Sequence, residues 1–383
     1  MRFSKAFFVL LLAVAAGGCA RSVVKPLLSG NGGGEDWLMA GADRGRSFQV
    51  ARAVKLPLQE IAHFKLSSAP AQNLFIKNGH LLVPTLDGRL SVLDLTSRKI
   101  LSKKKLTGGN AGTLALGDNA LIVALRYGKE TLFHHDLKKT RQVWGVDAGD
   151  IAGEPLLADT VVYAAAILNH IDAYSLRHGK RLWRFDTDGQ LHASPVMAEN
   201  IVVVATAKGK IYALNAGDGK KLWEKNLQQP VLSSPVIRDR KIYVGTARDL
   251  LVALELESGK ELWRQTLPGR IFYSPAISDS LLIVGGSDGV VTAFSRDTGK
   301  QKWSTRAFSV IGTSPLITGN EVFFGALDHH IYCVNLADGE LKWRQELRGR
   351  VRTNPIVWKN QLILASEDRD LYIFGPPENL ATN

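Results

Sequence analysis

Short strand-like runs alternate with polar turns along most of this chain. Within residues 234–263, apolar and β-branched residues concentrate at 235–237, 242–246, 250–254 and 261–265. Each run has the length and the β-branched or aromatic content of a strand, and no segment of the unit sustains a helical period. Four short antiparallel strands in about forty residues predict one blade of a β-propeller.

Tryptophans mark the period of this unit. They recur at intervals of 39 or 40 residues, at Trp144, Trp183, Trp223, Trp263, Trp303 and Trp343. The ring stands at one register, just after a turn that usually contains glycine. We interpret it as structural, because a flat ring there would pack on the neighbouring blade and cover the backbone at the glycine.

Weaker copies extend this register upstream to Leu101 and Phe64, which gives eight positions. A three-stranded set follows each position, and the last set ends at 370–374 without a fourth strand. The strand around Phe64 is unpaired in this scheme and can supply the missing one. The sequence therefore predicts an all-β, eight-bladed propeller of four-stranded antiparallel blades, the last closed by an N-terminal strand.

The N-terminal residues predict export and a lipid anchor. A charged start precedes an apolar stretch, 7–16, that is too short to span a membrane. Ala16-Gly17-Gly18-Cys19 then resembles a lipobox, in which Cys19 becomes the lipidated first residue. An ordinary signal peptide cleaved nearby is the alternative. We divide the chain into a lipoprotein signal peptide at 1–19, a tether and lead-in segment at 20–57, the propeller at 58–376 and a tail at 377–383.

The residues after the lipobox bear on the compartment. Ala20, rather than aspartate, follows Cys19, as in lipoproteins sorted to the bacterial outer membrane. We expect a lipid-anchored protein that faces the periplasm. The only other cysteine is Cys333, so the lipidated chain can form no internal disulfide, and we interpret Cys333 as a small buried residue.

The segment from Ser295 to Trp303, Ser-Arg-Asp-Thr-Gly-Lys-Gln-Lys-Trp, resembles the pyrroloquinoline-quinone (PQQ)-type propeller repeat Asp-x-x-Thr-Gly-Lys-x-x-Trp. Ser295 stands at the usual aspartate position, and weaker copies precede Trp223 and Trp263. The resemblance covers about residues 36–374 and implies the propeller fold. Known members include quinone-dependent dehydrogenases and a lipoprotein of the outer-membrane β-barrel assembly complex.

Residues for catalysis are scarce. The dehydrogenases typically carry adjacent cysteines over the cofactor and ligands for calcium, and this chain has no such cysteine pair. His134-His135 and His329-His330 lie on predicted strands, where neighbouring side chains point to opposite faces. The acidic turn Glu367–Asp370 is interpreted as solvated. We expect no cofactor, no metal site and no catalytic residue, and therefore no enzyme.

The net charge of +12 favours anionic partners such as lipid headgroups, polyanions or an acidic protein surface. We expect no nucleic-acid partner for an exported lipoprotein. A generally solvated basic surface is the alternative. Basic residues gather at Arg98-Lys99, Lys103-Lys104-Lys105, Lys138-Lys139-Thr140-Arg141 and at three arginines near 350.

The segments between the fourth strand of one blade and the first strand of the next are expected around the channel mouth. Two of them combine cations with aromatic or alternating arginine side chains, which are the usual anchors of protein interfaces. The predicted partner-binding residues are Arg270, Phe272, Tyr273, Phe308, Arg348, Arg350 and Arg352. Alternatively, Phe272 and Tyr273 pack inward between blades.

These features predict a protein-binding scaffold that docks other envelope proteins, including a component of β-barrel assembly, as a monomer within a complex. A propeller module that binds polyanions or glycans is one alternative. An enzyme or small-molecule sensor that uses the central channel, such as a quinone-dependent dehydrogenase, is another.

Overall fold

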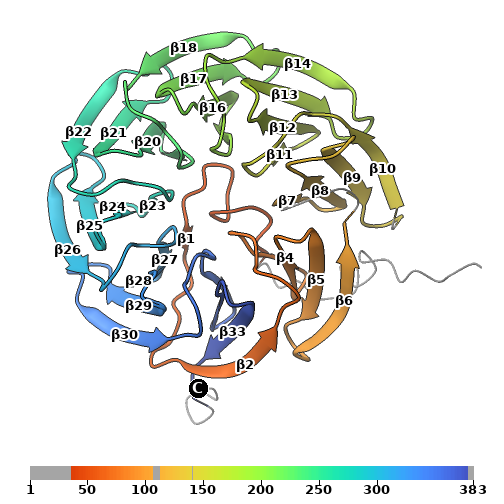
Figure 1. The fold of residues 1–383 in the computed structure, drawn as a ribbon. Helices are drawn as coiled ribbons and strands as arrows, with labels where there is room; N and C mark the ends of the chain where they lie inside the picture. Colours follow the sequence, from red (N-terminus) through yellow and green to blue (C-terminus); the bar gives the residue numbers. More distant parts are fainter. Residues whose placement is uncertain (1–35, 107–112, 140, 378–383) are drawn as a thin grey trace, which may run out of the picture.

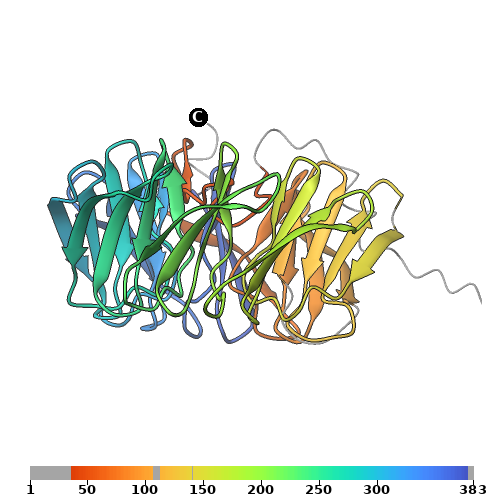
Figure 2. The same cartoon turned by 90° about the horizontal axis from the view of Figure 1, so that it is seen from above.

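The computed structural model describes residues 36–106, 113–139 and 141–377, which form eight small antiparallel sheets arranged in a ring (Figure 1). Turned by 90°, the ring is a flat disc (Figure 2). The predicted eight-bladed propeller is thus confirmed. No helix that is long and apolar enough to cross a membrane occurs among these residues.

Each of the first seven blades is a four-stranded meander that runs outward from the channel. Blades 1 to 4 consist of β3 (Phe75–Lys77), β4 (His80–Pro84), β5 (Arg89–Asp94) and β6 (Lys99–Lys105); β7 (Thr113–Leu116), β8 (Ala120–Ala124), β9 (Leu132–Asp136) and β10 (Arg141–Val146); β11 (Leu156–Ala158), β12 (Val161–Ala166), β13 (His170–Ser175) and β14 (Arg181–Asp186); and β15 (Val196–Ala198), β16 (Ile201–Ala205), β17 (Lys210–Asn215) and β18 (Lys221–Asn226).

The remaining blades repeat this order, and two of them also receive an N-terminal strand. Blades 5 to 8 consist of β19 (Val236–Arg238), β20 (Lys241–Gly245), β21 (Leu250–Glu255) and β22 (Glu261–Thr266); β23 (Ala276–Ile277), β24 (Leu281–Gly285), β25 (Val290–Ser295) and β26 (Gln301–Arg306); β27 (Leu316–Thr318), β28 (Glu321–Gly325), β29 (His330–Asn335) and β30 (Leu341–Glu346), with β1 (Gln49–Val50) parallel to β27; and β31 (Ile356–Trp358), β32 (Gln361–Ala365) and β33 (Asp370–Gly375), with β2 (Gln59–Lys65) beside β33.

The hydrophobic pattern follows the position of each strand in its blade. β16 is buried along its whole length because neighbouring blades cover both of its faces. The outermost strand β18 instead alternates between exposed and half-buried positions, because one face meets solvent. The core is therefore a series of contacts between adjacent blades, as expected for a repeat protein.

The repeat tryptophans of blades 2 to 7 join each of these blades to the next. Trp263 Nε1 donates a hydrogen bond of 3.0 Å to the carbonyl of Arg296. A Cβ added to Gly299, whose φ is +69°, would lie 2.7 Å from the Trp263 ring. The same ring-on-glycine contact occurs at Trp144–Gly179, Trp183–Gly219, Trp223–Gly259 and Trp303–Gly339. Glycine is thus needed both for the turn and for the approach of the ring.

The N-terminal strand closes the ring, as predicted. β2 pairs antiparallel with β33, with Phe64 opposite Leu371. Trp343 Nε1 donates to the carbonyl of Leu58 at 3.1 Å, so the last of the six repeat tryptophans contacts the closing segment.

Asp370 belongs to this closure and corrects one expectation. We interpreted the turn Glu367–Asp370 as solvated, but Asp370 is fully buried. Its carboxylate accepts hydrogen bonds from His63 at 2.8 Å and Lys65 at 3.1 Å, both on β2. Burial acts to raise the pKa of Asp370, but these two partners hold it below its ordinary value.

The lead-in segment touches all eight blades. Its residues 37–48 run around the inside of the ring before β1. Their hydrogen bonds join Trp37 to Ile76 and Val357, Leu38 to Leu116, Ala40 to Glu154, Arg44 to Met197, Gly45 to Ile237, Ser47 to Ile277 and Phe48 to Ile317. One short segment therefore bonds to backbone groups on the innermost strand of every blade except blade 3, where the Glu154 carboxylate accepts the amide of Ala40.

Candidate functional site

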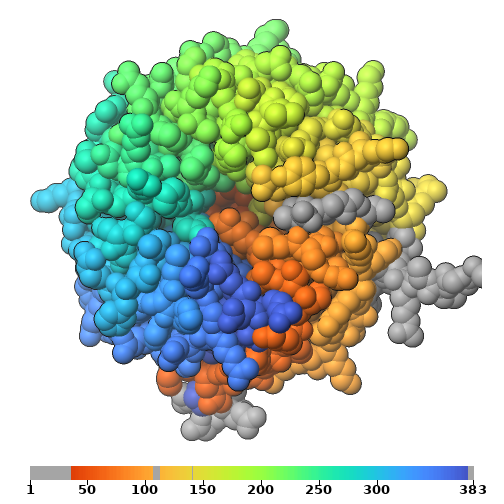
Figure 3. Space-filling model, in the orientation of Figure 1, coloured from red at the N-terminus to blue at the C-terminus, as the bar shows by residue number. Residues whose placement is uncertain are grey.

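A cavity of about 260 Å³ lies at the centre of the ring, where the space-filling view shows the molecule hollowed (Figure 3). Its walls come from the segments that enter the innermost strands, and the lead-in segment contributes Ala40, Arg46 and Phe48. The sequence predicted these entry segments at the channel mouth. We call the face on which they lie the mouth face.

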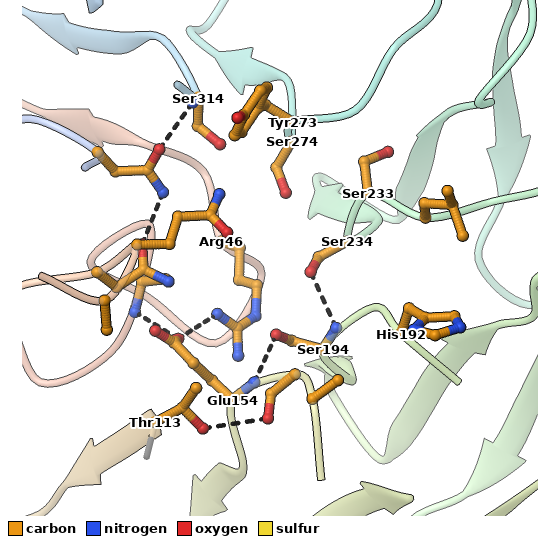
Figure 4. A pocket seen from close by; sticks show the side chains of 18 of the residues that line it. Arg46, Thr113, Glu154, His192, Ser194, Ser233, Ser234, Tyr273, Ser274 and Ser314 are labelled. Carbon is orange, nitrogen blue, oxygen red and sulfur yellow. Dashed lines mark hydrogen bonds and ion pairs between the residues drawn. The ribbon is translucent and has the colours of Figure 1, made fainter. Parts of the chain in front are cut away.

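A ring of polar side chains lines this cavity (Figure 4). Its members stand at 40-residue intervals, each directly before a proline: Glu154, Ser194, Ser234, Ser274, Ser314 and Asn354. Proline favours an extended conformation at the preceding residue.

These side chains also link consecutive blades. The amide of Glu154 donates to Ser194 Oγ at 2.9 Å, and the amide of Ser194 donates to Ser234 Oγ at 3.0 Å. The amide of Ser314 donates to Asn354 Oδ1 at 2.7 Å. The repeated Ser-Pro pair was a visible signal in the sequence, and our reasoning from the sequence missed it.

Glu154 breaks the serine register and forms a buried ion pair with Arg46 (Figure 4). Arg46 Nη1 lies 2.6 Å from Glu154 Oε2, and only 2% of each side chain is exposed. Oε2 also accepts the amide of Ala40 at 3.1 Å, and Arg46 Nε donates to the carbonyl of Pro195 at 3.4 Å. The pair thus fixes the lead-in segment to blade 3.

Phe272 and Tyr273 line the cavity. Phe272 is 39% exposed, whereas the preceding Ile271 is fully buried against Gly245. Burial raises the pKa of Tyr273, and Arg352 and Glu367 are close enough to act on it electrostatically. The structure therefore brings together Tyr273 of the segment entering blade 6 and Arg352 of the segment entering blade 8.

The other predicted partner-binding residues lie around this mouth. Phe308 is 78% exposed, with the Arg344 guanidinium 5.5 Å from its ring centroid. Arg270 is exposed, as are the three arginines of the segment 348–352. That segment bends at Gly349, whose φ is +78°.

Arg350 and Arg352 lie in one extended stretch, whereas Arg348 does not. Arg350 and Arg352 flank Val351, which is buried and forms an isolated β-bridge with Ser366. Arg352 Nε also lies 2.6 Å from Glu367 Oε1. Arg348 lies on the other side of the bend, and its amide donates to the hydroxyl of Tyr372 at 3.0 Å.

Exposed apolar side chains are distributed unevenly over the molecule. One half lies on the outermost strands, at Leu101, Val143, Leu182, Leu222, Leu262 and Leu341. The other half lies on loops of the mouth face, at Leu86, Tyr127, Leu168, Leu232, Phe272 and Phe308. Within the described ranges, the turns of the opposite face expose no large apolar side chain.

Histidines do not form a metal site in the part of the chain that the structure describes. His134 is buried and His135 half-buried, and burial lowers the pKa of both. His329 is exposed and His330 half-buried. The described residues contain no group of three or more His, Cys, Asp or Glu placed to hold a metal ion.

The fold and this cavity define the class of protein as an eight-bladed propeller of the PQQ-repeat type. A family model described as outer membrane protein assembly factor BamB matches residues 86–236, 231–326 and 309–375. The chain therefore belongs to the BamB family. The search of curated proteins gives no significant match.

Solved structures show the same fold in proteins of different activity. BamB from Moraxella catarrhalis is 19% identical over 84% of this chain and all of that chain, with a TM-score of 0.71. Quinohemoprotein alcohol dehydrogenase from Comamonas testosteroni is 13% identical over 94% of this chain and 83% of that chain, with a TM-score of 0.76. A europium-containing methanol dehydrogenase is 12% identical over 92% of this chain and all of that chain, with a TM-score of 0.76.

The cavity does not fit a quinone cofactor bound with a metal ion. Glu154 is the only carboxylate among its lining residues, and it is already bonded to Arg46. The cysteines of the chain, at positions 19 and 333, are not adjacent. The lining therefore offers neither adjacent cysteines nor an unpaired carboxylate for such a group, although Asn73 and Asn354 contribute amide side chains.

Proposed function

We propose that this protein is an envelope scaffold that docks another envelope protein on its mouth face. The contrast between the two faces carries the proposal: the loops of the mouth face expose large apolar side chains, and the described turns of the opposite face expose none. Phe272 and Phe308 are accompanied there by Arg270, Arg350 and Arg352. Aromatic and arginine side chains are enriched among the residues that dominate binding energy at interfaces.

The family and the N-terminal residues support a location and a kind of partner. A lipid on Cys19 would hold the chain at the outer membrane, facing the periplasm. The family description, outer membrane protein assembly factor, favours a β-barrel assembly component as the partner. In this proposal the protein acts as a monomer within a complex and is not an enzyme.

Photocrosslinking tests the docking face directly. A photoreactive residue is placed at Phe308 or Phe272, and a matched control is placed at Lys220, an exposed turn residue of the opposite face. We expect a discrete crosslinked product from the two mouth positions in cells and none from Lys220. Equal products from all three positions, or a product only from Lys220, would reject the mouth face as the docking surface.

A second function, adhesion to an anionic envelope surface, is favoured by the charge of blades 1 and 2. Residues 75–146 contain twelve lysines and arginines but five aspartates and glutamates. Lys103, Lys104 and Lys105 lie at the mouth end of the outermost strand β6. Reversing these three charges should abolish sedimentation with phosphatidylglycerol vesicles at low salt, whereas reversing Lys220, Lys221 and Lys300 should not. Equal effects of both reversals would exclude a dedicated basic surface.

A further inference from the structure

Two charged atoms at the base of the cavity lack hydrogen-bond partners among the described residues. They are Arg46 Nη2 and Glu154 Oε1, which belong to the ion pair between the lead-in segment and blade 3. Both side chains line the cavity and are nearly inaccessible from outside (Figure 4). Buried polar atoms are almost always hydrogen-bonded, so the site presents one donor and one acceptor to an occupant.

The chemistry of this base excludes several kinds of occupant. A divalent cation requires several oxygen ligands, and the only carboxylate of the lining is neutralised by Arg46. At the base, an anion would need an unpaired cation, but Arg46 is paired with Glu154. The other arginine of the lining, Arg126, is exposed on the loop between β8 and β9. An apolar molecule would leave both atoms unsatisfied. A hydroxyl group both donates and accepts a hydrogen bond, so hydroxyl-rich neutral molecules match the base.

The cavity walls above Arg46 and Glu154 also favour a neutral ligand that is rich in hydroxyl groups. The Ser274 hydroxyl points into the cavity and makes no hydrogen bond to the described residues (Figure 4). Ser234 Oγ accepts the amide of Ser194, and its own proton remains available to an occupant. Phe272 and Tyr273 add aromatic surface to the same lining. A sugar ring carries hydroxyl groups around its edge and apolar C–H groups on its faces, which suits such a wall.

The cavity is much larger than a site for one water molecule. About 260 Å³ is far more than the roughly 10–15 Å³ that one water molecule needs. We propose that the channel cavity binds a single neutral sugar ring, either a free monosaccharide or the terminal unit of an envelope glycan. Arg46 and Glu154 would bond its hydroxyl groups from below, and Ser234 and Ser274 from the side. This proposal does not rest on protein docking on the mouth face, although Phe272 belongs to both surfaces.

Saturation-transfer NMR on the mature chain tests the proposal. The probes are glucose, galactose and N-acetylglucosamine at millimolar concentration, each also as the non-reducing end of a trisaccharide. We expect saturable binding of at least one monosaccharide. If the natural ligand is the terminal unit of a glycan, the matching trisaccharide should bind more tightly than the monosaccharide. If the natural ligand is a free sugar, the trisaccharide should bind more weakly than the monosaccharide.

Substitutions locate the binding. Ser274→Val removes a hydroxyl without breaking a bond to the described residues, and it should weaken binding at least tenfold. Ser234→Thr keeps a hydroxyl and should retain binding. Ser258→Val, in an exposed turn of the opposite face, is the control and should change nothing. Absence of saturable binding by every probe, which would mean that water alone occupies the cavity, overturns the proposal. So does equal binding by Ser274→Val and the wild type.

Discussion

Replacing Arg46 by Met should destabilise the propeller strongly. The substitution keeps an apolar stem of similar length but removes the guanidinium that lies 2.6 Å from Glu154 Oε2. It leaves a carboxylate that is 2% exposed without a countercharge. Breaking a buried ion pair by removing one partner costs about 3–5 kcal/mol, because the remaining charge stays buried.

Two further variants separate this cause from loss of packing. In Arg46→Met combined with Glu154→Met, no uncompensated charge remains, but the amide of Ala40 loses its acceptor. The remaining cost should be about 1–3 kcal/mol, less than for the single variant. Arg44→Met is the matched control from the same segment. Its pair with Asp159 spans 2.7 Å, but the two side chains are 43% and 78% exposed, so removal should cost at most about 1 kcal/mol.

Equilibrium unfolding in urea, followed by tryptophan fluorescence, measures these differences. The reasoning requires Arg46→Met to be the least stable of the three variants. The reasoning would be refuted if the unfolding free energy of Arg46→Met stayed within about 1 kcal/mol of the wild-type value, because a loss that small is expected only for an exposed ion pair. A double variant less stable than Arg46→Met would also refute it, because the buried charge would then not be the cause.

Three other outcomes are expected. Cys19→Ser should release the protein from membranes or block its processing, and unchanged retention with a mature N-terminus elsewhere would rule out the anchor. Deleting residues 58–68 removes β2 and exposes the edge of β33, so it should reduce solubility or stability. Deleting residues 20–34 should do neither. Equal stability of the two truncated proteins in urea would contradict closure by β2. His63 and Lys65 hold the pKa of Asp370 in the folded protein below the value of about 3.9 expected in the unfolded chain. The ionised Asp370 therefore stabilises the fold above about pH 4, and this stabilisation is lost as the pH falls through the folded pKa. Unfolding free energies measured from pH 6 to pH 3 should therefore depend less on pH in Asp370→Asn, and an unchanged slope would show that this carboxylate does not drive the loss.

The architecture was predictable because its determinants are local and repeated. Trp183, Trp223 and Trp263 mark the same turn in successive blades, and each blade contacts mainly its neighbours. The number of blades and the spare strand around Phe64 followed from counting these units. An open sheet edge would leave backbone N–H and C=O groups unpaired, so pairing of the strand around Phe64 with the last blade was the expected arrangement.

The candidate site was only partly predictable from sequence. The entry segments at the mouth could be expected, and Phe272 and Tyr273 were among the residues singled out. The bend at Gly349, which separates Arg348 from Arg350, could not be read from alternating arginines. The Ser-Pro pairs were a periodic signal for the polar ring, but its use as a cavity wall depended on where the entry segments point.

The tertiary structure alone decided which distant residues meet. Arg46 and Glu154 are 108 positions apart, and neither stands in a motif that marks it as one half of an ion pair. Asp370 looked like a solvated turn residue until β2 brought His63 and Lys65 to it across about 300 positions. A local pattern of polar and apolar residues specifies the strands and their turns. The charge and burial of a single side chain depend instead on what the closed ring places beside it.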